Sequence, residues 1–134
     1  KLEEKKKKSK TERWQAIAES AAKQSKRNIV PIINTPLSFS ALMKKTDEFD
    51  VFLVPYESED GMKSTRLALS KIKSGSRIAI LIGPEGGFDE KEIEICREKN
   101  TDIISLGKRI LRTETAAVTS VGMCMLYCEL EEDL

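Results

Sequence analysis

The chain has 134 residues, enough for one domain with a buried core. Hydrophobic residues make up 40% of it and charged residues 34%, which is typical of a globular domain with a well-charged surface. No apolar run reaches the length that crosses a bilayer, so the sequence argues against a membrane-spanning protein.

The formal net charge of +1 hides an asymmetry along the chain. Residues 1–27 contain ten Lys or Arg and four Asp or Glu, whereas residues 129–134 contain four acids and no base. A basic amino-terminal region can attract nucleic acid through its phosphates. A solvated terminus is the other interpretation, and we expect residues 1–9 to form a disordered or frayed basic segment.

The chain contains three cysteines and no histidine. We expect a cytoplasmic protein, because these thiols occur without a secretory signal in the sequence. Cys124 and Cys128 are four residues apart and would share one face of a helix, so a shared metal is conceivable. Too few other ligands exist for a metal site, and we therefore predict buried structural thiols and no metal.

The first predicted elements are a helix and a short strand. Apolar residues recur at helical spacing from residue 10 to residue 27, which predicts an amphipathic helix with Trp14 on its core-facing stripe. Residues 29–33 follow as a strand. Pro31 donates no hydrogen bond, so this strand is expected at a sheet edge or to start late.

The middle of the chain alternates helices and strands. Ser38 is a candidate N-cap for a short helix through Met43. The apolar run 51–54 ends at Pro55 and predicts a strand buried on both faces, as in a parallel sheet. A mobile acidic loop over residues 57–63, a helix over residues 65–73 and a strand over residues 77–82 follow in that order.

The last third repeats this alternation. Asp89 and Glu92 have the spacing of a capping box that opens a helix, and residues 102–106 form another buried strand. The segment 116–130 predicts a helix too apolar to face water on any wide side, so the domain or a second subunit must cover it. The whole pattern predicts an α/β fold with a mainly parallel sheet and flanking helices.

Two glycine-containing turns follow strands, where open α/β sheets place their ligands. The first, residues 82–88, lacks the spacing of a P-loop or a dinucleotide fingerprint, and Glu85 disfavours a bound phosphate. A ligand with a sugar, an amino group or a sulfonium charge suits it better. The second, residues 106–116, keeps Ile110 and Leu111 in a loop, and Thr113 can cap the helix that follows.

These two turns carry a family resemblance. The runs Gly83-Pro84-Glu85-Gly86-Gly87-Phe88 and Leu106-Gly107-Lys108-Arg109-Ile110-Leu111-Arg112-Thr113-Glu114-Thr115-Ala116 resemble the RsmE family. Its members are small-subunit ribosomal RNA uridine-N3 methyltransferases of the SPOUT, or α/β-knot, superfamily. The stretches 12–14, 21–27 with Pro31, and 53–57 also match the family pattern, so the resemblance extends over residues 10–130.

The resemblance implies S-adenosylmethionine as methyl donor, a deep trefoil knot near the carboxyl terminus and an obligate homodimer. It implies that residues 10–134 form a SPOUT methyltransferase domain. Family members carry an amino-terminal RNA-binding β-barrel, so the chain is expected to be a fragment without this barrel and with an incomplete sheet. The cofactor-binding residues carried over by position are Leu53, Val54, Pro55, Ile82, Gly83, Glu85, Gly87, Leu106, Gly107, Ile110, Leu111, Arg112, Thr115 and Ala116.

The expected reaction is attack of uridine N3 on the sulfonium methyl group. Glu114 is the candidate catalytic carboxylate for the N3 proton, with Arg112 orienting it or stabilising charge on the uracil oxygens. Glu85 is the alternative base. Candidates for contact with small-subunit ribosomal RNA are Gln24, Ser25 and Arg27, at the end of the first helix.

Two other functions fit parts of the sequence. A non-catalytic RNA- or nucleotide-binding α/β module would explain the basic helix and the glycine turns. A flavodoxin-like regulatory domain would explain the sheet but not the loop 106–116. Binding of S-adenosylhomocysteine separates methyl transfer from the first alternative.

Overall fold

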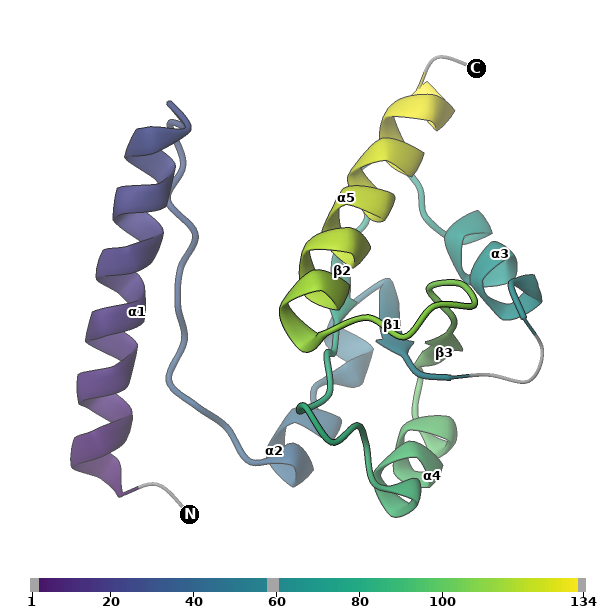
Figure 1. Ribbon diagram of the computed structural model, residues 1–134, viewed down its shortest axis with the longest axis horizontal. Coiled ribbons are helices and arrows are strands. Elements are labelled where there is room, and N and C mark those ends of the chain that lie inside the picture. Colours follow the sequence, from purple (N-terminus) through teal and green to yellow (C-terminus); the bar gives the residue numbers. More distant parts are fainter. Residues whose placement is uncertain (1–2, 58–60, 133–134) are drawn as a thin grey trace. The chain divides into compact units, whose positions relative to one another are not determined.

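The computed structural model of the chain describes residues 3–57 and 61–132. The chain forms two compact units, Lys1–Phe39 and Ser40–Leu134, and the second one contains the sheet (Figure 1). Part of the acidic loop predicted over residues 57–63, namely residues 58–60, lies outside the described residues. No helix of the described residues is long and apolar enough to cross a membrane.

Helix α1, Glu4–Gln24, fills most of the first unit. It starts earlier than predicted, so the described part of the segment 1–9 is helical rather than frayed, and residues 1–2 lie outside the described residues. Lysine is a good helix former, and local contacts support this end of the helix. Lys7 pairs with Glu4 at 3.3 Å, and the Thr11 hydroxyl donates to the Lys7 carbonyl at 2.7 Å.

The carboxyl end of α1 closes in a Schellman motif. The Arg27 N–H donates to the Ala22 carbonyl at 2.9 Å, and the Lys26 N–H donates to the Lys23 carbonyl at 3.2 Å. Lys26 adopts a φ of 58°, the left-handed conformation that glycine usually supplies at this position. The chain therefore turns sharply within the segment predicted to contact RNA.

Two predictions for the first unit are wrong. Residues 29–33 are extended but form no strand, because Pro31 lacks an N–H and the Gln15 side chain takes the neighbouring polar groups. The Gln15 amide donates to the Pro31 carbonyl at 2.9 Å and accepts from the Ile33 N–H at 2.8 Å. Trp14, predicted to lie in the core, is 40% exposed.

The second unit alternates helices and strands as predicted, with boundaries shifted by a few residues (Figure 1). The main shift concerns the last helix, which already begins at Thr113, so this residue lies within the first turn instead of capping it. Helix α2, Phe39–Met43, begins at the last residue of the first unit. The other elements of the second unit are η1 Thr46–Glu48, β1 Val51–Pro55, α3 Lys63–Ser70, β2 Ile78–Ile80, α4 Glu90–Glu98, β3 Asp102–Ile104 and α5 Thr113–Glu132.

The three strands form a parallel sheet in the order β2-β1-β3. Leu53 of β1 lies opposite Ile80 on one side and Asp102 on the other. The central position of β1 explains why residues 51–54 are buried throughout. The predicted α/β class with a parallel sheet and flanking helices is confirmed.

One face of the sheet carries the main hydrophobic core. Val51 and Leu53 point to this face and belong to the same cluster as Ala68 of α3, Ile104 of β3 and Cys124 of α5. Helices α3 and α5 therefore cover this face. Because all three strands run in parallel, the loops that follow them emerge at one edge of the sheet.

Candidate functional site

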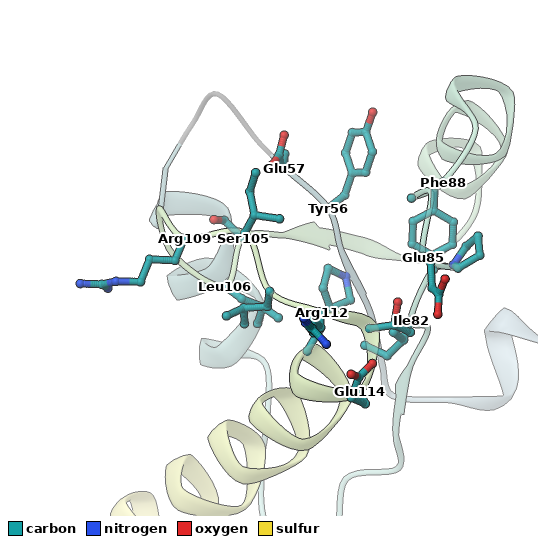
Figure 2. Close-up of a pocket in the computed structure, with 18 of the residues that line it drawn as sticks. Tyr56, Glu57, Ile82, Glu85, Phe88, Ser105, Leu106, Arg109, Arg112 and Glu114 are labelled. Atoms are coloured by element: carbon teal, nitrogen blue, oxygen red, sulfur yellow. The ribbon is translucent and has the colours of Figure 1, made fainter.

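The loops that follow the three strands enclose a pocket of about 1170 Å³ in the second unit (Figure 2). One wall comes from residues 55–57 after β1, another from residues 82–88 after β2, and a third from residues 105–116 after β3 and at the start of α5. This is the edge where open α/β sheets bind ligands. The volume exceeds that of a typical drug-sized pocket, so there is room for a nucleoside and a second group.

The first glycine turn, residues 82–88, is held at both ends. The Leu81 N–H donates to the Leu53 carbonyl at 2.8 Å, which extends the ladder of β2 to the mouth of the turn. The Phe88 ring covers Gly83 so closely that a Cβ at this position would lie 3.0 Å from ring carbons. A Cβ at position 83 would therefore require the Phe88 ring to shift by a few tenths of an ångström.

Helix α4 begins directly after this turn and anchors it. Asp89 accepts from the Lys91 N–H at 2.9 Å, and Glu92 accepts from the Asp89 N–H at the same distance. The predicted capping box is thus confirmed. The side chains of this capping box accept from backbone N–H groups at the start of α4, so those groups are not free to bind a ligand.

The second glycine turn starts with a hydrogen-bonded Ser105. Its hydroxyl donates to the Gly107 carbonyl and accepts from the Gly107 N–H, each at 3.2 Å. Gly107 has a φ of 107°, a conformation that other residues rarely adopt. Leu106 lies between these two residues and faces the pocket, as Figure 2 shows.

Charged side chains from two walls converge on the pocket. Arg112 and Glu114 lie together at the amino end of α5, and Glu85 extends from the first glycine turn (Figure 2). Across the ranges 3–57 and 61–132, no ion pair involves any of these three side chains. They are therefore available to a ligand, two as hydrogen-bond acceptors and one as a cationic donor.

Most of the predicted site residues come together in this pocket. Predicted residues that line it are Pro55, Ile82, Gly83, Glu85, Gly87, Leu106, Gly107, Ile110, Leu111, Arg112, Glu114 and Ala116. Thr115 is absent from the lining, and Leu53 and Val54 are fully buried within the sheet below it. The side chains of these two residues support the pocket floor rather than reach its interior.

Further lining residues were not predicted as site residues. Tyr56 and Glu57 lie next to each other at the end of β1, where the Tyr56 N–H continues the ladder by donating to the Ile104 carbonyl at 2.8 Å (Figure 2). Position directly after a strand is the signal that would have found them. The other unpredicted residues are Pro84, Gly86, Phe88, Ser105, Lys108, Arg109 and Thr113.

The residues predicted to contact RNA belong to the first unit, at the end of α1. Gln24, Ser25 and Arg27 are all exposed. The Ser25 hydroxyl is engaged locally, donating to the Ala21 carbonyl at 2.9 Å. Exposure and positive charge suit this end of α1 to phosphate contact.

The prediction of buried thiols holds for two of the three cysteines, whereas Cys128 is only half-buried. Cys96 and Cys124 are buried, and burial raises the pKa of both thiols, which keeps them protonated and unreactive. Among the described residues, no group of His, Cys, Asp and Glu could hold a metal ion.

Comparison with known proteins gives the family. A family model described as an RNA methyltransferase domain matches residues 1–125. The ribosomal RNA small subunit methyltransferase E of Bacillus subtilis is 42% identical, over 97% of this chain and 52% of that protein. Its namesake from Mesomycoplasma hyopneumoniae is 36% identical, over 87% and 48%. The chain thus spans about half the length of the curated relatives it matches.

Solved structures agree with this assignment. A crystal structure described as a hypothetical protein matches with a TM-score of 0.87 and 40% identity, over 97% of this chain and 51% of that one. The ribosomal RNA small subunit methyltransferase E of Neisseria gonorrhoeae, bound to S-adenosyl methionine, matches with a TM-score of 0.77 and 30% identity, over 92% and 50%. The chain therefore belongs to the RNA methyltransferase domain family and, within it, to the RsmE methyltransferases that its two glycine turns resemble.

Proposed function

We propose that this chain binds S-adenosylmethionine in the pocket at the sheet edge and that its protein methylates N3 of a uridine in small-subunit ribosomal RNA. The observation that carries the proposal is the pairing of two family-specific glycine turns around one pocket of about 1170 Å³. The Neisseria gonorrhoeae relative and a putative methyltransferase from Legionella pneumophila, 26% identical, were both solved with this methyl donor bound.

The chemistry of the pocket suits this methyl donor. Leu106, Ile110 and Leu111 offer an apolar surface for an adenine ring, while the glycine turns allow backbone groups to approach the ligand. The lining combines the cations Lys108, Arg109 and Arg112 with acids that include Glu85 and Glu114, and these carboxylates can face a sulfonium. S-adenosylmethionine, when bound, supplies an electrophilic methyl group on that sulfonium.

The residues of this chain would then accept the N3 proton and stabilise the negative charge that develops on the uracil oxygens. Uracil N3 must lose its proton to form a bond to carbon, and we propose the Glu114 carboxylate as acceptor, with Glu85 as the second candidate. Arg112 is the residue directly before α5 and lines the pocket. Its guanidinium would stabilise negative charge on the uracil oxygens. Glu114, in the first turn of α5, lines the same pocket.

Four further features belong to the proposal. The exposed end of α1, with Gln24, Ser25 and Arg27, would contact ribosomal RNA, and the protein would act in the cytoplasm. We propose the deep trefoil knot of the family for the region that ends in α5. The same helix would pair with a second copy in a homodimer, because it exposes Val118, Val121, Met125, Leu126 and Leu130.

Methyl transfer from labelled S-adenosylmethionine to small-subunit ribosomal RNA tests the function. We expect transfer by the full-length protein that carries this chain, and a loss of about 10²-fold or more when Arg112→Ala or Glu114→Gln is introduced into it. Arg97→Ala and Glu94→Gln, two exposed positions on α4 away from the pocket, are the matched controls and should transfer normally.

The same assay shows which carboxylate accepts the N3 proton, that of Glu85 or that of Glu114. A larger loss in Glu85→Gln than in Glu114→Gln would assign the base to the first glycine turn. RNA binding without any methyl transfer would contradict the proposal and favour a non-catalytic binding module.

A further inference from the structure

A buried polar contact links helix α3 to the second glycine turn. Thr65 is 1% exposed, and its hydroxyl donates to the Ser105 carbonyl at 2.6 Å. The same hydroxyl accepts from the Ser105 N–H at 2.9 Å. One side chain thus satisfies both backbone groups of a residue 40 positions further along the chain, just where β3 ends and the pocket wall begins.

Ser105 in turn fixes the next part of the second glycine turn. The Ser105 hydroxyl pairs with both the N–H and the carbonyl of Gly107 at 3.2 Å. Thr65 and Ser105 together therefore occupy the backbone polar groups on either side of Leu106. In the described part of the chain, the Leu106 N–H and carbonyl have no hydrogen-bond partner of their own.

The packing of α3 does not need this hydroxyl. Ala68, Leu69 and Ile72, at the end of α3 and just beyond it, already bind this segment to the hydrophobic core. A hydrogen bond adds only about 0.5–1.5 kcal/mol of net stability. Without the Thr65 hydroxyl, however, both backbone groups of the buried Ser105 would lose their partner, so this contact fixes the Ser105 backbone. This backbone segment lines the pocket.

We propose that Thr65 is a positioning residue for the methyl donor: it fixes Ser105 so that the free Leu106 peptide groups face the ligand. This inference rests on the proposed function, because it takes the ligand to be S-adenosylmethionine. The two Leu106 groups offer one donor and one acceptor, the pair that the amino edge of an adenine ring requires. Thr65 itself does not line the pocket and acts through Ser105.

The test compares three variants of the full chain by calorimetry with S-adenosylhomocysteine. Thr65→Val keeps the shape and removes the hydroxyl, and we expect binding about tenfold weaker. Thr65→Ser restores the hydroxyl and should bind within about twofold of the wild type. Thr46→Val removes another buried hydroxyl, bonded to the Met43 carbonyl away from the pocket, and should bind like the wild type even if it lowers the melting temperature.

Hydrogen exchange of the ligand-free chain provides a readout that does not depend on the ligand. The Ser105 and Gly107 amides should exchange faster in Thr65→Val than in Thr46→Val. Unchanged exchange at these amides, or wild-type binding by Thr65→Val, would overturn the positioning role. If the wild type does not bind S-adenosylhomocysteine but Thr65→Val still exchanges faster, the proposed ligand is refuted. Thr65 would then still be shown to fix the second glycine turn. If Thr65→Val does not fold, Thr65→Ala takes its place with the same expected results.

Discussion

Single residues define the shape of the first glycine turn. The Phe88 ring lies against Gly83, while a Cβ at Gly86 would meet no atom within 4 Å. Two glycines of the same turn thus have different requirements: one is fixed by a neighbouring side chain, and the other has space around it.

This difference predicts opposite effects of the same substitution. Gly83→Ala forces the Phe88 ring to move and should lower the free energy of unfolding by about 1–3 kcal/mol. Gly86→Ala should leave it unchanged or raise it by up to about 1 kcal/mol, because alanine restricts the unfolded chain. Urea unfolding of the ligand-free variants measures both, and equal stabilities would show that Phe88 does not constrain position 83.

The family resemblance of the two motif runs predicted most of the residues that line the pocket. The two motif runs contain most of the lining residues, and those outside them are Pro55, Tyr56, Glu57, Ile82 and Ser105. Tyr56 and Ser105 were missed because each is one residue in a strand-to-loop transition, without a pattern of its own. The Thr65–Ser105 contact spans 40 positions and leaves no signature in the sequence.

Among the secondary-structure elements, helix α4 fixes the far end of the first glycine turn. Its capping box was predictable because Asp89 and Glu92 act over three residues, within the reach of local sequence patterns. The contribution of this cap can be isolated by substitution.

Asp89→Ala removes the side-chain acceptor of the cap and should lower the free energy of unfolding by about 1 kcal/mol. Asp89→Asn keeps an acceptor and should lose less. Thermal unfolding of both variants checks the order. Equal losses would mean that the charge of Asp89 near the helix start, rather than its hydrogen bond, stabilises α4.

The first unit shows where element prediction fails. The apolar run 29–33 has the composition of a strand, yet a strand exists only with a ladder partner, and the Gln15 side chain binds its polar groups instead. Helix α1 extends towards the amino terminus because lysines favour helix even without a hydrophobic stripe. The first outcome depends on a long-range contact that composition does not specify, whereas the second follows from helix propensity, which a search for hydrophobic periodicity does not detect.

At the scale of the whole molecule, helix α5 connects the pocket to the exposed apolar surface. Its first residues line the pocket, and Ser120 and Cys124 are buried on its inner side. Val118 and Val121 on its outer side are 75% and 55% exposed. A helix that is apolar on both sides was predicted from the sequence, and its exposed side is the basis for the proposed homodimer.

Val121→Glu tests that assembly. A charge in the centre of an apolar contact loses its hydration, so we expect the variant to be monomeric where the wild type sediments as a dimer. Leu67→Glu, at an exposed position of α3, is the matched control and should remain dimeric. Sedimentation velocity distinguishes the two, and a dimeric Val121→Glu would place the interface elsewhere.

The central claim is that the pocket between the two glycine turns binds the methyl donor. Titration calorimetry of the folded chain with S-adenosylhomocysteine tests it most directly, with adenosine triphosphate as a control that shares the nucleoside but carries phosphates. We predict saturable binding of S-adenosylhomocysteine at one site per chain and much weaker binding of the triphosphate, because the first glycine turn lacks the spacing of a phosphate-binding loop and carries Glu85. A folded chain that binds neither compound, or that prefers the triphosphate, would contradict the account.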